Sequence, residues 1–255
     1  MITEQPSRGY VIVATVKKSF LLSAFNLMES IKDFYPEAKI TLFTEQEWID
    51  TENYNWDEFD NVFPCASYFR SKMYGIANTP YDQTFYIDAD CVIEHEDIKH
   101  VFDNLDGHDM VYVELTEVAK HHFADWDWGP GPIDHLTHCG GVVLYDKRNP
   151  LVLEFMEDWN KIFPKQDNGD WWPIPEIPKR FNKWDQFTLW YLIHHDPKYK
   201  SLKIKYFEDG YRWNYFSSFG FNLDGSYNYG VKDPIVLHYS SWMDKDGNKG
   251  FLSNV

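Results

Sequence analysis

Cysteine is scarce in this sequence: Cys65, Cys91 and Cys139 are the only three in 255 residues. An odd and sparse set cannot supply the framework of disulfides that holds small secreted domains together. The cysteine content therefore argues against a disulfide-stapled fold and suits a reducing compartment. We expect a cytoplasmic protein.

Long hydrophobic runs are also missing. The apolar segment 11–16 has six residues, which is too short for a signal-peptide core or a membrane span. No other window approaches the roughly 18 apolar residues that a membrane helix needs. The sequence also contains no basic amphipathic helix and no lipid-anchor motif. It therefore predicts a soluble protein without stable membrane insertion.

Positive charge is in short supply as well. The chain has 24 Lys+Arg against 40 Asp+Glu, so its formal net charge is −16. This excess argues against a protein held on nucleic acid by a general basic field, although residues 179–205 include a modestly basic stretch. An apolar content of 44% excludes a disordered chain. Because no repeat or linker divides the sequence, we expect one domain over residues 1–255.

Strands and helices alternate in the first 90 residues. This order predicts an α/β fold with a mostly parallel sheet and helices on its faces. In the second half, long loops are expected at 125–138 and 164–183. The expected strands are 11–16, 39–44, 61–64, 83–88, 110–115, 141–145 and 235–238, and the expected helices are 20–34, 69–77, 150–163 and 185–194.

The strongest chemical signal is an Asp-x-Asp motif at the end of an apolar strand. Asp88 and Asp90 follow Thr84-Phe-Tyr-Ile87, and strand alternation predicts that both carboxylates lie on one side. Ligands of open α/β sheets bind outside the carboxyl ends of the strands. Two hard oxygen ligands at that place can share a divalent cation with the oxygens of a diphosphate.

Other polar positions extend this signal. Lys72 lies on the expected helix before the strand, and the pair Gly140-Gly141 stands at a strand entrance where a ligand can approach the backbone. Asp185 and Gln186 begin a helix, and His238 ends the last strand. Each of these positions alone can be explained by a structural role. Their order along the chain, taken together, favours a ligand-binding site.

In these blocks the chain resembles the GT-A-fold glycosyltransferases, within them the family 8, glycogenin-like group. The resemblance runs from Tyr10 to about Lys249. It implies a Rossmann-like, mostly parallel sheet with helices on both faces. It also implies a nucleotide-sugar donor (a UDP-sugar), a divalent metal (Mn²⁺, with Mg²⁺ as an alternative) and retention of the anomeric configuration. Residues 1–90 would form the nucleotide-binding half and 91–255 the acceptor-binding half.

The resemblance also implies roles for individual residues. The implied metal ligands are Asp88, Asp90 and His238, and the implied catalytic residues are Asp185, Gln186 and Lys72. The implied donor-binding residues are Ala14, Thr15, Val16, Phe20, Lys72, Asp88, Ala89, Cys139, Gly140, Gly141 and Lys245. The chain departs from the family pattern at Cys139-Gly140-Gly141, where an Asn-[Ser/Thr]-Gly segment is common, and in its last segment, where Lys245 or Lys249 would be the diphosphate lysine.

Two other functions share parts of this pattern. Haloacid-dehalogenase-like phosphatases also place Asp-x-Asp after an apolar strand, but there the motif usually opens the fold and Cys91 stands where Thr or Gly is expected. A catalytically silent nucleotide-sugar binder would be expected to have lost some of the charged residues. The acceptor stays open between a glycan, a protein hydroxyl, a lipid-linked sugar and a modified nucleic-acid base.

Two weaker signals lie in the second half. His135, His138 and Cys139 have the spacing of a partial zinc site but lack a fourth ligand. The two long loops could frame the acceptor with aromatic faces, or their rings could pack the loops down. The tryptophans concerned are Trp126, Trp128, Trp171, Trp172 and Trp184.

Overall fold

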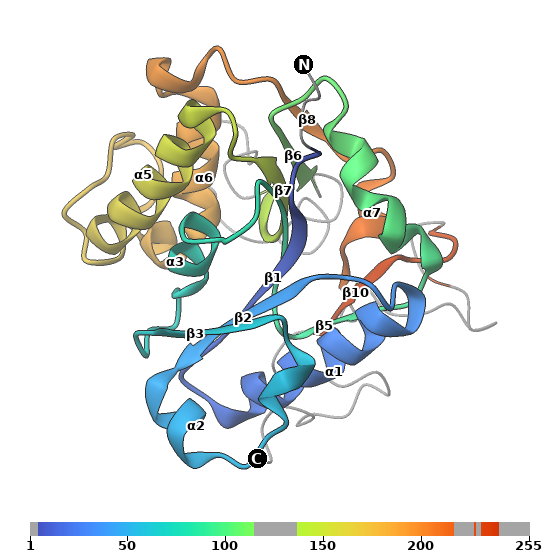
Figure 1. Cartoon of the computed structure of the whole chain (residues 1–255). Helices are drawn as coiled ribbons and strands as arrows, with labels where there is room; N and C mark the ends of the chain where they lie inside the picture. The colour runs from blue at the N-terminus through green and yellow to red at the C-terminus, as the bar shows by residue number, and fades with distance from the viewer. Residues whose placement is uncertain (1–4, 115–136, 217–226, 228–230, 240–255) are drawn as a thin grey trace.

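The computed structural model describes residues 5–114, 137–216, 227 and 231–239 (Figure 1). Most of the expected loop at 125–138, with Trp126, Trp128 and His135, lies outside these residues. Lys245 also lies outside them. No described helix has both the length and the apolar character needed to cross a membrane.

A seven-stranded sheet forms the centre of the described structure, in the order β3-β2-β1-β4-β7-β6-β8. Four of its strand pairs are parallel, and β7 runs antiparallel to both β4 and β6. The sheet is therefore mostly parallel, as the sequence predicts. Its strands are β1 (Arg8–Ala14), β2 (Ile40–Glu45), β3 (Asn61–Cys65), β4 (Gln83–Ile87), β6 (Met110–Glu114), β7 (His138–Asp146) and β8 (Ile204–Tyr206).

Helices cover both faces of this sheet (Figure 1). One face packs against α1 and η2, and the other against α3, α5 and α6. The helical segments are α1 (Lys18–Phe34), α2 (Gln46–Thr51), η1 (Trp56–Glu58), α3 (Lys72–Ala77), η2 (Glu96–Leu105), α5 (Pro150–Asp167), η4 (Lys179–Lys183), α6 (Asp185–His194), η5 (Pro197–Tyr199) and α7 (Gly210–Trp213).

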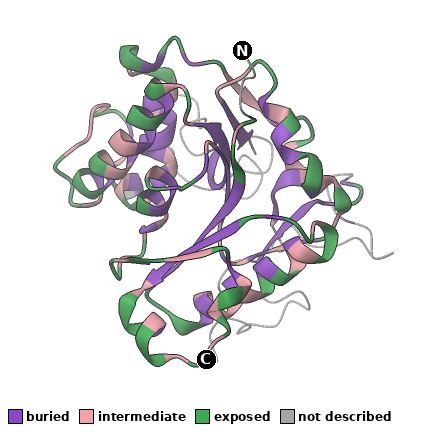
Figure 2. Ribbon diagram, in the orientation of Figure 1, coloured by how far each residue is buried: buried purple, intermediate pink, exposed green. Residues whose placement is uncertain are grey.

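The central strands are buried along their length (Figure 2). Successive side chains of β1 alternate between the two cores: Tyr10 and Ile12 belong to one, and Val11 and Val13 to the other. Because both faces are covered, these strands are continuous apolar runs rather than alternating polar and apolar sequences. This is why β1 and β4 could be located from the sequence.

A small second sheet brings two distant segments together. Its strands β5 (Cys91–Ile93), β10 (Val236–His238) and β9 (Tyr215–Phe216) lie in the order β5-β10-β9. The antiparallel register between β5 and β10 places His238 opposite Cys91. The end of the described chain therefore lies beside the Asp-x-Asp motif.

The predicted α/β fold is confirmed, and most predicted elements lie close to the observed ones. The helix predicted over 185–194 has the bounds of α6. The helix predicted over 150–163 continues to Asp167, so the first residues assigned to the loop 164–183 are helical and Pro164 lies within α5. The helix predicted over 69–77 begins only at Lys72.

Candidate active site

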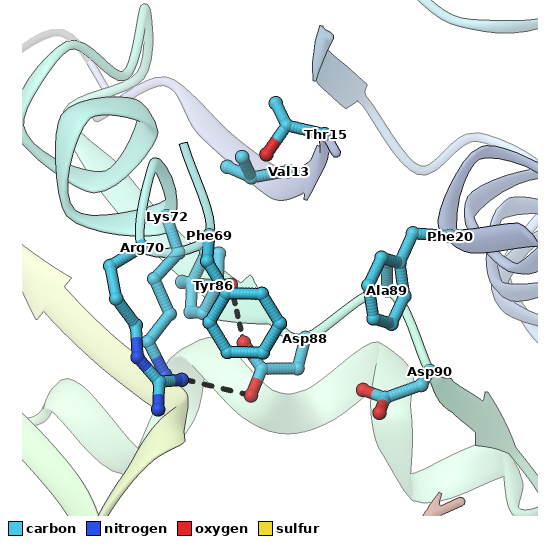
Figure 3. Close-up of a pocket in the computed structure, with 10 residues that line it drawn as sticks. All are labelled: Val13, Thr15, Phe20, Phe69, Arg70, Lys72, Tyr86, Asp88, Ala89 and Asp90. Carbon is cyan, nitrogen blue, oxygen red and sulfur yellow. Dashed lines mark hydrogen bonds and ion pairs between the residues drawn. The ribbon is translucent and has the colours of Figure 1, made fainter. Parts of the chain in front are cut away.

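A cleft opens at the carboxyl ends of β1 and β4 (Figure 3). Its walls come from these two strands, from the first turn of α1 and from the segment that leads into α3. This is the place where open α/β sheets bind ligands. The lining residues are Val13, Thr15, Phe20, Phe69, Arg70, Lys72, Tyr86, Asp88, Ala89 and Asp90.

The two carboxylates of the Asp-x-Asp motif have different partners. The hydroxyl of Tyr86 donates to Asp88 Oδ1 over 2.5 Å, and Asp88 Oδ2 lies 3.7 Å from Lys72 Nζ. Asp90 Oδ1 instead lies 3.2 Å from His238 Nε2. Strand β4 ends at Ile87 and Asp90 lies in the turn that follows, so strand alternation does not place Asp90, although both carboxylates line the cleft.

The first group of charges surrounds Lys72. Its Nζ lies 2.8 Å from Asp185 Oδ2, and Arg70 Nη1 lies 3.5 Å from Asp185 Oδ1. Burial alone would lower the pKa of Lys72, but the carboxylates of Asp185 and Asp88 outweigh burial and raise it. Burial would likewise raise the pKa of Asp185, but Lys72 and Arg70 lower it overall. Both groups are therefore charged at neutral pH.

The Asp185 carboxylate is not saturated by its neighbours. Its side chain is 3% exposed, and Oδ2 accepts no hydrogen bond from the described residues. The partner of this oxygen among the described residues is the Lys72 ammonium, which forms an ion pair with it. A buried polar atom without a hydrogen bond is costly in a folded protein unless a ligand or water completes it.

The glycine pair allows these carboxylates to lie against the backbone of β7. A Cβ on Gly140 would lie 2.6 Å from Asp185 Oδ2, and one on Gly141 would lie 2.5 Å from Asp88 Oδ2 and 3.1 Å from His238 Cε1. The pairing of β6 with β7 shifts at this point, between Tyr112 and Val113. Side chains from three other elements can therefore converge on the two glycines.

The second group of charges surrounds His238 at the end of β10. Its Nδ1 lies 2.9 Å from Asn214 Oδ1, and its ring stacks on Phe216 with centroids 4.3 Å apart. An amide oxygen only accepts, so the hydrogen-bond network assigns a proton to Nδ1. Asn214 also donates to Cys139 Sγ over 2.7 Å. Asn214 thus fixes the orientation in which Nε2 faces Asp90.

Among the His, Cys, Asp and Glu side chains of the described residues, Asp90, Cys91 and His238 could share a metal ion, because their ligand atoms all lie within 4.8 Å of one another. Burial, with Asp90 and Asp88 nearby, raises the pKa of Cys91 well above its usual value, so this thiol is protonated at neutral pH. The remaining carboxylate and imidazole suit a divalent cation such as Mn²⁺. The donor set therefore fits the expected metal, with Asp88 outside the group on the Lys72 side.

Burial would lower the pKa of His238, but the carboxylates of Asp90 and Asp88 raise it overall. Without a cation, the imidazole therefore has an increased tendency to be protonated. A cation and a proton compete for the same nitrogen.

Some of the remaining residues predicted to bind the sugar donor line the cleft, and others do not. Thr15, Phe20 and Ala89 line the cleft, whereas Ala14 is fully buried on the other face of β1. Val16 is 42% exposed and has φ = 75°, an uncommon backbone conformation for a β-branched residue. Its N–H donates to Glu45 Oε1 over 2.6 Å. Strained backbone of this kind is often found where ligands bind.

Six further predicted residues are not among those that line the described cleft: Cys139, Gly140, Gly141, Asp185, Gln186 and His238. Cys139 is turned toward Asn214, and Gln186 is half-buried in the first turn of α6. Val13, Phe69, Arg70 and Tyr86 line the cleft but were not predicted. Strand alternation was a signal for Val13, two residues before Thr15, and for Tyr86, two residues before Asp88, whereas no local pattern indicates Phe69 or Arg70.

The partial zinc motif does not form from His138 and Cys139. These neighbours lie on β7, where successive side chains point to opposite faces. His138 contacts His194, and Cys139 contacts Asn214 on the other side. This pair therefore does not share a zinc ion, and the weak zinc signal of the sequence has no counterpart in His138 with Cys139.

Two of the loop tryptophans pack against α6. Trp172 stacks on Phe187 with ring centroids 4.3 Å apart, and Trp171 meets the edges of Phe187 and Tyr191. Trp184 is half-buried directly before Asp185. Trp184 belongs to the same cluster, with its ring centroid 6.1 Å from that of Phe181, so packing accounts for all three of these described tryptophans.

Comparison with known proteins finds similarity in structure only, because no family model and no curated protein matches the sequence. The glycosyltransferase GlyE of Streptococcus pneumoniae superposes with a TM-score of 0.56 at 14% identity. The match covers 93% of this chain and 56% of GlyE, so the chain spans little more than half of that protein.

Two other solved structures share the fold. Galactosyltransferase LgtC, solved with donor and acceptor sugar analogs, matches at 13% identity and a TM-score of 0.52, over 94% of this chain and 90% of LgtC. The bifunctional glycosyltransferase WbbM matches at 10% identity and a TM-score of 0.54, over 100% of this chain and 51% of WbbM. This chain has the GT-A-like fold of these glycosyltransferases.

Proposed function

We propose that this protein is a cation-dependent glycosyltransferase that uses a UDP-sugar as donor and retains the anomeric configuration. The observation that supports this most strongly is the convergence of two charged groups on one cleft. Lys72, Asp88 and Asp185 form one group, and Asp90 with His238 forms the other. The fold that positions these residues is shared with LgtC, whose structure contains donor and acceptor sugar analogs.

Aromatic rings and one cation at the mouth of the cleft suit a nucleoside. Phe69 is 58% exposed, its ring centroid lies 6.5 Å from that of Phe20, and the Arg70 guanidinium lies 4.8 Å above it. An exposed aromatic face can stack on a base, and a neighbouring guanidinium can pair with phosphate oxygens. In the proposal, Thr15 and the strained Val16 backbone border the nucleoside.

The two charged groups divide the remaining tasks. Asp90 and His238 would hold Mn²⁺ or Mg²⁺, and the bound cation would neutralise charge on the leaving diphosphate. Lys72, held charged between two carboxylates, would stabilise the same developing charge. Asp185 has a free acceptor position for a sugar hydroxyl, and Gln186 follows it in the same turn. Retention is the part of the proposal that stands on the family resemblance.

Thermal unfolding with UDP, GDP, CDP and ADP, each with and without Mn²⁺, tests the donor site first. A ligand that binds only the native state raises its stability by mass action. We expect a Mn²⁺-dependent rise in Tm with UDP that is lost in Asp90→Asn. No rise with any nucleotide would contradict the donor assignment, and metal-dependent cleavage of a generic aryl phosphate would favour the phosphatase alternative.

Turnover completes the test. Hydrolysis of one UDP-sugar in the presence of Mn²⁺ would distinguish an enzyme from a silent binder. The acceptor can then be screened among glycans, proteins, lipid-linked sugars and modified nucleosides. NMR of the first product reports the anomeric configuration, and inversion would contradict the retaining part of the proposal.

A further inference from the structure

A second group of potential ligand atoms lies away from the cleft. It consists of His138 at the start of β7, His194 at the end of α6 and Tyr206 at the end of β8. His138 Nε2 lies 2.9 Å from His194 Nε2 and 2.9 Å from the Tyr206 hydroxyl, and the hydroxyl lies 3.4 Å from His194 Nε2. Three elements therefore place three donor atoms in one small triangle.

This triangle is separate from the candidate active site. His194 is the last residue of the ten-residue helix α6, and Asp185 is the first. At about 1.5 Å per residue, the two ends of the helix are roughly 14 Å apart. His138 also points away from Cys139 and from the network of Asn214 and His238.

The size of the triangle suits a metal ion. Zinc binds imidazole nitrogen at about 2.0–2.1 Å in tetrahedral sites, so two such nitrogens lie about 3.3 Å apart. The observed separations of 2.9 to 3.4 Å are close to this spacing. His138 is 1% exposed, whereas His194 is exposed, so one ligand is held in the protein interior and another is open to solvent.

The chemistry of the donors selects a class of metal. Two imidazole nitrogens and a phenol oxygen favour late first-row cations such as Zn²⁺ and Cu²⁺, whereas Mg²⁺ and Mn²⁺ prefer carboxylate and phosphate oxygens. We propose that His138, His194 and Tyr206 form a second metal site that binds Zn²⁺ and links β7, α6 and β8. Binding requires both imidazoles to be neutral, with their protons on Nδ1, and it releases the proton of the Tyr206 phenol to solvent.

Zinc binding to the full-length protein, after removal of metals with a chelator, tests this site. Equilibrium dialysis gives the number of Zn²⁺ ions per chain and their affinities. His194→Ala should weaken one class of sites by at least about 10-fold, because that nitrogen is a direct ligand. His195→Ala is the matched control: its exposed ring packs on Trp190 and Tyr191 and lies outside the triangle.

The donor cleft is tested separately with His238→Ala, because Asp90, Cys91 and His238 can also hold Zn²⁺. The proposal requires a class of Zn²⁺ sites that persists in His238→Ala and His195→Ala but weakens in His194→Ala. Titration with Cu²⁺ should also give a tyrosinate charge-transfer band that Tyr206→Phe removes. Zinc affinities identical in wild type and His194→Ala would overturn the proposal and leave the triangle as a hydrogen-bonded cluster.

Discussion

Carboxylates lie beside both ends of strand β4, but their partners differ. At its amino end, the buried carboxylate of Asp146 accepts hydrogen bonds from Gln83 Nε2 at 2.9 Å, from the Arg148 N–H at 3.0 Å and from Arg148 Nε at 2.9 Å. At its carboxyl end, Asp88 and Asp185 face the Lys72 ammonium mainly as ion pairs.

The difference distinguishes a carboxylate that stabilises the fold from carboxylates placed for a ligand. Asp146 has several hydrogen-bond donors in fixed geometry, so little is gained by adding another partner. Asp185 Oδ2 has the Lys72 ammonium as its partner at 2.8 Å, and a carboxylate oxygen has two lone pairs, so it can also accept a hydrogen bond from a ligand hydroxyl. Changes at the carboxyl end should therefore lower turnover, whereas changes at the amino end should leave turnover unchanged.

The largest effect is expected from Lys72→Ala. Loss of the ammonium removes a charge that stabilises the leaving diphosphate, and turnover of the UDP-sugar should fall by about 10²- to 10³-fold. It also leaves the buried Asp185 with Arg70 as its remaining cationic partner. Breaking a buried ion pair costs on the order of 3 kcal/mol of unfolding free energy. Steady-state kinetics and urea unfolding measure the two effects.

Lys72→Arg is the control for Lys72→Ala, because it keeps the positive charge and should restore most of the stability. In Lys72→Ala, UDP affinity in the presence of Mn²⁺ should fall less than turnover. An equal loss of UDP affinity and turnover would place Lys72 on the bound diphosphate in the ground state, and unchanged turnover would contradict its role altogether.

Alanine at the two glycines should separate the two charged groups. In Gly141→Ala, the new Cβ would displace Asp88 or His238, so Mn²⁺-dependent UDP binding should weaken strongly. In Gly140→Ala, the new Cβ meets Asp185, so turnover should fall while Mn²⁺-dependent binding is retained. Calorimetric titration with UDP and Mn²⁺ compares them, and the same loss of binding in both variants would contradict this division.

The general layout could be predicted from local sequence patterns. Buried strands are apolar runs, and the helix predicted over 185–194 has the bounds of α6. The family resemblance indicated Lys72, Asp88, Asp90, Asp185 and His238. The structure brings all five to the carboxyl ends of the strands, although it divides them into two groups.

What could not be predicted depends on contacts between distant residues or on where a strand ends. Both carboxylates of the Asp-x-Asp motif line the cleft, but strand alternation does not place Asp90, because β4 stops at Ile87 and Asp90 lies in the turn that follows. Asn214 and His238 meet only because β9 and β10 pair. The contact between His138 and His194 joins residues 56 positions apart, and no spacing within either segment indicates it.

A smaller effect is expected from Asn214→Ala, which removes the partner of His238 Nδ1 without removing a ligand. The ring loses its fixed orientation, and Mn²⁺ affinity should fall by about 10-fold, within the range known for residues that orient metal ligands. Electron paramagnetic resonance of free Mn²⁺ measures the affinity. Asn168→Ala, at an exposed position beyond α5, is the control. Equal affinities in the two variants would show that Asn214 does not orient the imidazole.

The smallest effect is expected from Asp146→Asn, at the opposite end of β4. Burial would raise the pKa of Asp146, but hydrogen bonds from Arg148 and Gln83 lower it overall. A lowered folded-state pKa gives stability that is fully present above the unfolded value near 3.9 and is lost as the pH falls through the folded value. Since the Arg148 side chain is half-exposed, solvent screening limits the loss in Asp146→Asn to about 1 kcal/mol at pH 7.

The difference in unfolding free energy between wild type and Asp146→Asn should therefore shrink as the pH is lowered from about 5 to 3, because the wild-type carboxylate becomes protonated. Urea unfolding at each pH measures it, and kcat/KM at pH 7 should stay at the wild-type value. A fall in kcat/KM comparable to that of Lys72→Ala would erase the distinction between the two ends of β4. If the difference in unfolding free energy did not change with pH, the negative charge of Asp146 would contribute nothing to stability at this end of β4.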